Sequence, residues 1–150
     1  MRLLHISMTA RDAAALSGFY CKALGFVERR PATRLVGAAV SRGNGLPGVG
    51  LTAIWLCLPD DPGPFLEIME FDRTVERSLP AVNEPGYAHL AFAVPDLSQA
   101  IARILKCGGS SQGEVTDLGS PGRPHRIIYM RDPEGNLLEL EQMASGDEGD

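Results

Sequence analysis

The second half of this 150-residue chain repeats the first half in register. His5 and Asp12 are matched by His89 and Asp96 at one constant spacing. Self-similarity over this length predicts two copies of one supersecondary unit, each of which buries its apolar residues in the same way. The repeat therefore restricts the chain to a duplicated architecture.

Each copy reads as a strand, a helix and three further strands, the pattern βαβββ. The first helix is expected after Asp12, whose carboxylate can accept hydrogen bonds from free backbone N–H groups, and it is expected to end at Gly25. Asp96 and Gly108-Gly109 bracket the second helix in the same way, and the glycine-rich stretch 41–50 is expected to form a loop. Hydrophobic patterning predicts strands at 3–10, 34–41, 51–59, 65–71, 87–94, 126–130 and 137–142, with an extended piece near 113–118.

We expect an α+β fold in which both βαβββ modules belong to one domain, residues 1–143. The modules are placed at about 1–72 and 86–143, joined by a proline-containing linker, 73–85. The acidic end, 144–150, has no apolar anchor and is expected to be disordered.

Each copy contains one histidine in its first strand and one glutamate in its last. Because strand side chains alternate between faces, the four groups can point into one concave surface if the copies pack around a pseudo-twofold axis. Two neutral imidazoles and two carboxylates form a neutral site for a divalent ion, and mixed N/O donors suit Ni, Co, Fe, Mn or Zn. The predicted ligands of one divalent metal are His5, Glu67, His89 and Glu139.

A single histidine or glutamate in a strand is more often a core or solvent-facing residue than a ligand. The coincidence of both residue types at matching positions favours the metal site. Glu141 shares a face with Glu139 and could replace it, although the repeat favours Glu139. Glu70 points away from Glu67 by alternation and is a poor candidate.

Charge and cysteine usage exclude several classes of partner. The formal net charge is −5 and the largest basic cluster is the pair Arg29-Arg30, which argues against nucleic acid. No apolar run approaches the roughly 20 residues that span a bilayer, and the N-terminus does not read as a signal peptide. Three widely spaced cysteines are expected to be reduced, partly buried thiols of a cytoplasmic protein.

The chain resembles the vicinal oxygen chelate superfamily, which includes glyoxalase I, methylmalonyl-CoA epimerase, extradiol dioxygenases, and fosfomycin and bleomycin resistance proteins. The resemblance covers roughly residues 2–142. It implies two modules that form a curved, incompletely closed mixed sheet around the metal, and it implies a homodimer. The stretches that carry it are MRLLHI, GFYCKALGF, FLEIMEF, YAHLAFAVPDL and YMRDPEGNLLELEQ.

The same resemblance implies an enzyme, a metal-dependent isomerase, epimerase or lyase acting on a small molecule. Such a substrate chelates the metal through vicinal oxygens and reacts by proton transfer through an enolate or enediolate, with Glu139 or Glu67 as the base. An Fe(II) extradiol-type dioxygenase is a second possibility, and a non-catalytic drug-binding resistance protein is a third.

Five further residues are candidates for contact with the substrate. The loop GSPGRPH and the strand after it supply three of them, although a solvated basic loop is an equally good interpretation. Trp55 could line the cavity, but an aromatic residue at strand spacing is more often core. Tyr87 shares a face with His89. The predicted substrate-binding residues are Trp55, Tyr87, Arg123, His125 and Arg126.

Overall fold

The computed structural model describes residues 1–61 and 63–144, and these form two compact units. The first unit is Met1–Arg77 and the second is Ser78–Asp150. Each unit has its own mixed sheet with a long helix packed on one face, which confirms the α+β class and the tandem modules. The predicted disordered tail falls, from 145 onward, outside the described residues.

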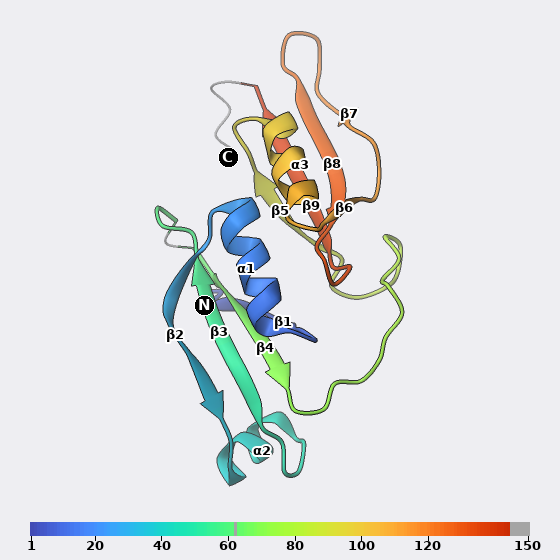
Figure 1. Cartoon of the computed structure of the whole chain (residues 1–150). Helices are drawn as coiled ribbons and strands as arrows, with labels where there is room; N and C mark the ends of the chain where they lie inside the picture. The colour runs from blue at the N-terminus through green and yellow to red at the C-terminus, as the bar shows by residue number, and fades with distance from the viewer. Residues whose placement is uncertain (62, 145–150) are drawn as a thin grey trace. The chain divides into compact units, whose positions relative to one another are not determined.

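The first unit contains a four-stranded sheet in the order β1-β4-β3-β2 (Figure 1). β1 runs parallel to β4, whereas the β4–β3 and β3–β2 pairs are antiparallel. This arrangement places the first and last strands of the module next to each other. The elements are β1 (His5–Thr9), α1 (Ala13–Leu24), β2 (Val27–Leu35), α2 (Ala38–Asn44), β3 (Leu51–Cys57) and β4 (Phe65–Phe71).

Helix α1 covers one face of this sheet and begins and ends as the sequence predicts. The Asp12 carboxylate accepts a hydrogen bond from the Ala15 N–H at 2.8 Å, and Gly25 ends the helix with a φ of 79°. The helix buries Leu16 and Tyr20 against β3 and β4. Because α1 occupies this face, Glu67 lies on the opposite face, beside the buried apolar cluster of Leu51, Ala53 and Trp55.

The predicted strand at 34–41 is wrong. Strand β2 ends at Leu35, Gly37 turns the chain with a φ of 102°, and Ala38–Asn44 forms a short helix. A short apolar run cannot be assigned to strand or helix by periodicity alone, and here tertiary packing decides. Val40 of α2 packs against the buried cluster that contains Leu51. The predicted loop 41–50 is correspondingly shorter, because its first residues belong to α2.

The second unit repeats this plan around a sheet in the order β5-β9-β8-β6, with β7 paired to β8. The Asp96 carboxylate accepts from the Gln99 N–H at 2.9 Å at the start of the helix, and Gly108 follows its end with a φ of 93°. The predicted cap and glycine stop are both confirmed. The elements are β5 (His89–Ala93), α3 (Leu97–Lys106), β6 (Ser110–Ser111), β7 (Thr116–Asp117), β8 (His125–Arg131) and β9 (Leu137–Met143).

Residues 72–88 contain neither helix nor strand. The start of the second unit is nevertheless tied to its own sheet, since Arg131 Nη2 donates to the Pro80 carbonyl at 2.9 Å. Gly135 in the β8–β9 turn has a φ of 87°, and a Cβ there would collide with Leu79. Among the described residues, no helix is long and apolar enough to cross a membrane.

Candidate functional site

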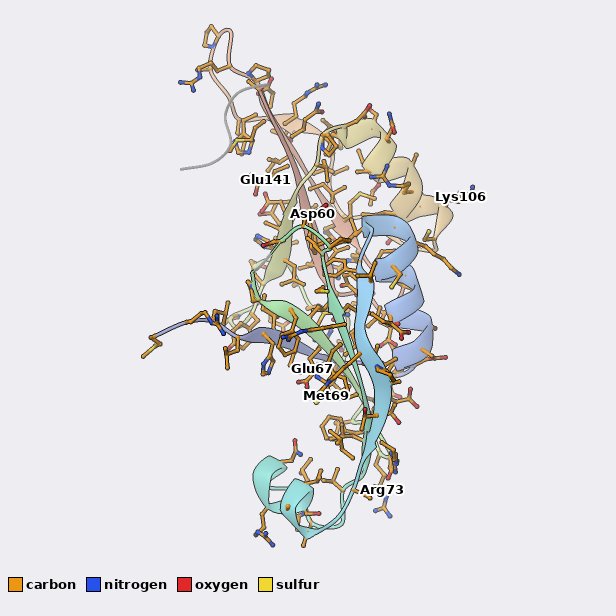
Figure 2. The ribbon with its side chains drawn as sticks, turned by 90° about the vertical axis from the view of Figure 1, so that its left-hand side faces the viewer. Asp60, Glu67, Met69, Arg73, Lys106 and Glu141 are labelled. Carbon is orange, nitrogen blue, oxygen red and sulfur yellow. The ribbon has the colours of Figure 1, made fainter. Side chains whose placement is uncertain are left out.

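In the first unit, β1 and β4 bring one histidine and one glutamate together. The parallel register sets Ser7 opposite Glu67, and His5 lies one alternation earlier on the same face. His5 Nε2 and Glu67 Oε2 are 3.7 Å apart. Figure 2 shows Glu67 and Met69 on β4, on the side of the sheet that α1 does not cover. We call this side, with Ser7, Trp55 and Glu67, the Glu67 face.

Both oxygens of the Glu67 carboxylate accept hydrogen bonds from the protein. Ser7 Oγ donates to Oε2 at 2.9 Å, and Trp55 Nε1 donates to Oε1 at 2.8 Å. Trp55 lies directly across from Glu67 in the β3–β4 pair and is 3% exposed. The His5 ring stacks on Phe65, with centroids 4.9 Å apart. These contacts fix the carboxylate while its side chain stays partly accessible.

The second unit contains the matching pair. His89 Nε2 and Glu139 Oε2 are 2.8 Å apart, and their side chains are 27% and 12% exposed. Tyr129 lies directly across from Glu139 in the β8–β9 pair, and its hydroxyl donates to that carboxylate. Burial, and then the negative charge of Glu139, raise the pKa of Tyr129 above its usual value, so the hydroxyl stays a donor. We call this side of the second sheet the Glu139 face.

Trp55 and Tyr129 therefore occupy equivalent positions, and each donates to the glutamate of its own unit. The sequence analysis placed Trp55 near the pocket but did not identify Tyr129. The signal in the sequence is slight: IWL of the first copy resembles IYM of the second, but the strand registers and not the spacing of the repeat pair the two stretches. Neither the direction of the side chain nor the hydrogen bond follows from that alignment.

The donor atoms of each pair suit adjacent positions on a divalent ion. Two ligands at about 2.1 Å from one ion and at right angles lie about 3 Å apart. The His89–Glu139 pair, at 2.8 Å, is close to this spacing, and the His5–Glu67 pair, at 3.7 Å, is wider. Imidazole nitrogen with carboxylate oxygen is also the donor set expected for such an ion. Within either unit, no three His, Cys, Asp or Glu side chains of the described residues could hold a metal by themselves. The four-ligand site stays a prediction that needs both units.

A third histidine–glutamate pair lies in the second unit alone. His125 Nε2 and Glu141 Oε2 are 2.7 Å apart, and Glu141 follows Glu139 on the same face of β9. The position of His125 is fixed by Asp117, whose Oδ1 accepts from the His125 N–H at 3.1 Å. Hydrogen bonds from Gly119 and His125 lower the pKa of this Asp117 carboxyl.

The counterparts of this third pair in the first unit are Leu51 and Met69, which the strand registers place at matching positions. Glu141 is therefore engaged with His125, so it does not replace Glu139 beside His89. Glu70 faces the other way, as predicted, and accepts a hydrogen bond from the Ala13 N–H at 2.8 Å.

The remaining predicted substrate contacts are not brought to the Glu139 face. Arg126 lies opposite Gln142 and Asp117 and so points to the other side of β8. Arg123 belongs to the turn that is closed by its backbone hydrogen bonds with Ser120. Tyr87 precedes β5 and is fully exposed. Of the loop residues singled out, the structure brings His125 alone to this face.

Two residues that the sequence analysis left without a role lie on the Glu67 face. The Arg29 guanidinium carbon is 4.4 Å from the centre of the Phe65 ring, and that of Arg30 is 3.4 Å from the Trp55 ring. The sequence shows the arginine pair, but adjacent strand residues normally face opposite ways. A register shift in β2 is what changes this expectation.

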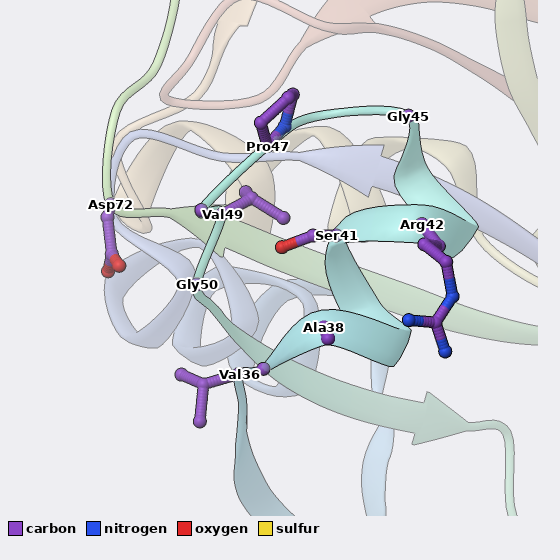
Figure 3. Close-up of a pocket in the computed structure, with 11 residues that line it drawn as sticks. Val36, Ala38, Ser41, Arg42, Gly45, Pro47, Val49, Gly50 and Asp72 are labelled. Atoms are coloured by element: carbon purple, nitrogen blue, oxygen red, sulfur yellow. The ribbon is translucent and has the colours of Figure 1, made fainter.

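The first unit also contains a hollow away from these residues (Figure 3). It lies beside α2 and the loop after it, and Val36, Ser41, Pro47, Val49 and Asp72 are among its lining residues. None of the predicted site residues lines it. The hollow is open and largely apolar, and the chemistry of the His/Glu pairs lies elsewhere.

A family model described as a glyoxalase-like domain matches residues 5–141. The chain belongs to this glyoxalase-like domain family. Its predicted place in the vicinal oxygen chelate superfamily is thereby confirmed. The family match spans both units, and it runs from the first predicted ligand to the third histidine–glutamate pair.

Similar proteins of known name and similar solved structures agree with this assignment. Human mitochondrial methylmalonyl-CoA epimerase is 24% identical over 141 residues, 94% of the glyoxalase-like chain and 73% of the relative. An ethylmalonyl-CoA/methylmalonyl-CoA epimerase of Cereibacter sphaeroides is 25% identical, over 95% and 98% of the two chains. A glyoxalase family protein from Bacillus cereus has a TM-score of 0.86 at 22% identity, covering 97% and 95%. Glyoxalase I from Zea mays has a TM-score of 0.68 at 20% identity, covering 96% of this chain and 45% of the maize chain.

Proposed function

We propose that this chain is a divalent-metal-dependent isomerase or epimerase that moves a proton at a carbon atom next to a carbonyl group. The observation that carries the proposal is the recurrence of one constellation in both units: a histidine, a glutamate and an aromatic donor to that glutamate. Chance pairing of surface residues would not reproduce all three groups on equivalent strands.

In the proposed site, His5, Glu67, His89 and Glu139 together hold one ion of the Ni, Co, Fe, Mn or Zn type. Such an ion would supply Lewis-acid stabilisation to two neighbouring oxygen atoms of the substrate. The hydrogen bonds from Trp55 and from Tyr129 would hold the two carboxylates in orientation.

The proton is transferred by the chain's own carboxylates. In an isomerase, Glu139 or Glu67 accepts the proton from the substrate carbon and returns it to a neighbouring carbon. In an epimerase, one of the two carboxylates accepts the proton and the other delivers a proton to the opposite side of the same carbon. Both carboxylates lie in partly buried surroundings that exclude much of the bulk water.

The names of the relatives suggest which substrate classes to test first. Because two of them are named as epimerases of methylmalonyl-CoA, acyl-CoA thioesters with a second carboxyl group are the first candidates. α-Hydroxy ketones are the second, since they also present two neighbouring oxygens. No contact among the described residues favours the extradiol-type dioxygenase or the drug-binding protein instead. We expect a homodimer, which sedimentation should report as twice the 16.1 kDa chain.

The test combines metal content with proton exchange. The protein is stripped with a chelator, reloaded separately with Ni, Co, Fe, Mn and Zn, and assayed for bound metal and for deuterium uptake from solvent into both substrate classes. Glu67→Gln and His89→Ala should each abolish metal retention, and Glu139→Gln should abolish exchange. Glu70→Gln is the matched control, because its carboxylate lies on the opposite face of β4.

Unchanged metal content in both Glu67→Gln and His89→Ala would eliminate the four-ligand site. Metal binding without deuterium uptake, together with oxygen consumption on catechols, would replace the isomerase by the dioxygenase. Circular dichroism of each variant shows whether a loss reflects the site or the fold.

A further inference from the structure

Strand β2 contains an irregularity that turns two consecutive arginines to the same side. Glu28 lies opposite Leu56 of β3, but Arg30 lies opposite Trp55, so Arg29 is an extra residue in the ladder. Such a bulge breaks the alternation of side chains and re-aims one of them. Both arginines contact aromatic rings of the Glu67 face as a result.

These contacts connect the arginines to the His5–Glu67 pair through two short chains of residues. Arg29 lies on Phe65, whose ring also stacks with the ring of His5. Arg30 lies on Trp55, whose indole N–H is bonded to Glu67. Planar guanidinium groups on aromatic faces are held in place while their N–H groups stay available.

The two guanidinium groups have no carboxylate partner among the residues that the structure describes. Across residues 1–61 and 63–144, neither Arg29 nor Arg30 forms an ion pair or a hydrogen bond with an acidic side chain. Their neighbour Glu28 lies on the other side of the strand. Burial raises the pKa of Cys21 on α1, and the negative charge of Glu28 raises it further. Both arginines are exposed, and their positive charge is uncompensated on a chain whose net charge is −5.

We propose that Arg29 and Arg30 form an oxyanion subsite, which binds a carboxylate or phosphate group of the substrate beside the His5–Glu67 pair. Two forked donors side by side match the planar carboxylate and the tetrahedral phosphate, each of which can accept paired N–H···O bonds. The role in catalysis rests on the proposed function, which it sharpens to substrates with an anionic group near the reacting carbonyl. The binding of the oxyanion itself needs no metal.

Trp55 makes the test specific, because it is the only tryptophan in the sequence and Arg30 lies on its ring. The metal-free protein is titrated with malonate and, separately, with inorganic phosphate, and sodium chloride of equal ionic strength is the reference. We expect a saturable change of tryptophan fluorescence beyond that of chloride, with the same affinity by calorimetry. Malonate binding alone would identify a carboxylate group, and phosphate binding alone a phosphoryl group.

The variants are Arg29→Gln, Arg30→Gln and the double substitution, with Arg42→Gln on α2 as the control. Each single change should weaken binding roughly tenfold or more, as expected for lost hydrogen bonds to a charged group. The double change should abolish saturation, and Arg42→Gln should bind like wild type. Arg29→Gln keeps the Arg30–Trp55 contact, so its fluorescence signal stays comparable.

Titration curves of the double variant that match wild type would overturn the proposal, as would wild-type curves no different from chloride. Metal content is measured on separate metal-loaded samples of the same proteins and should not change in the arginine variants. If Glu67→Gln and His89→Ala keep their metal while the arginine variants lose anion binding, the proposed function fails and the oxyanion subsite stands.

Discussion

Trp55 and Tyr129 differ in chemistry but hold the two glutamates in the same way. The indole N–H of Trp55 donates to Glu67 and the hydroxyl of Tyr129 donates to Glu139. Because both donors lie directly across an antiparallel strand pair from their acceptors, their orientation is set by the sheet rather than by a loop. Replacing the donor changes how the carboxylate is oriented, whereas replacing the glutamate removes the carboxylate itself. Single substitutions can therefore measure the two effects separately.

Removing one donor should weaken metal binding without removing a ligand. Trp55→Phe and Tyr129→Phe each keep an aromatic ring, and each should weaken affinity about 10- to 100-fold, the usual effect of losing a partner of a metal-bound carboxylate. Competition with a chelator of known affinity measures the change. Phe71→Leu, at the end of β4, serves as the control for altered packing. Equal affinities in all three variants would show that the donors do not act on the site.

Gly119 lies so close to the backbone of Arg123 and His125 that the 119–125 loop has no room for a side chain at this position. A Cβ at Gly119 would collide with the Arg123 carbonyl and lie 2.6 Å from the His125 nitrogen, both of them backbone atoms. We expect Gly119→Ala to destabilise the protein by about 1–3 kcal/mol, since backbone must move. Gly113→Ala is the control, because nothing lies within 4 Å of a Cβ there. Urea denaturation of both variants gives the comparison, and equal midpoints would contradict the expectation.

At the scale of single elements, helices α1 and α3 are the elements that the sequence predicts best. Asp12 and Asp96 both accept hydrogen bonds from the third helical residue, as their position before an apolar periodic run predicts. The cap of α3 also has a pH dependence. Hydrogen bonds from Gln99 lower the pKa of Asp96 below that of a free aspartate.

A lowered pKa in the folded state means that the unfolded chain takes up the proton more readily. The contribution of Asp96 to stability is therefore complete above the unfolded pKa, about 4, and is lost as the pH falls through the lower folded value. Asp96→Asn keeps an acceptor at the cap but cannot titrate. We expect similar urea midpoints for variant and wild type at pH 7, and a smaller decrease for the variant below pH 4. Parallel decreases in both proteins would contradict this assignment.

The strands were less predictable than the helices, for reasons visible in two segments. RLVGAAVS has the composition of a strand, yet Gly37 turns the chain and Val40 finds its partners through a helix. In β2, the bulge at Arg29 depends on the pairing with β3, which no local pattern encodes. A helix start marked by one aspartate, or a helix end marked by one glycine, can be predicted from the sequence. The register in which two strands pair cannot.

At the scale of the whole molecule, the central prediction is that ligands from both units bind one and the same metal ion. The repeat predicted which histidine and glutamate pair within each unit, and the structure places the two members of each pair close together within their own unit. The same repeat could not supply the aromatic donors or the arginines. Those depend on which residues face one another across strands, as Tyr129 does with Glu139.

A shared ion makes the first unit sensitive to a change in the second. Metal binding should protect the amides of β1 and β4 from hydrogen exchange, and Glu139→Gln should remove that protection although it lies in β9. Glu141→Gln, two residues away on the same face, should leave it intact because Glu141 is paired with His125. Full protection of β1 and β4 in Glu139→Gln would mean that each unit binds its own ion.

The His125–Glu141 pair makes the two modules chemically unequal. The second module carries an imidazole and a carboxylate where the strand registers place Leu51 and Met69 in the first. A polar group that contacts this part of the Glu139 face meets a hydrogen-bonding pair, whereas the matching part of the Glu67 face offers apolar side chains alone. The repeat therefore preserves the predicted ligands of both modules and not the surroundings of those ligands.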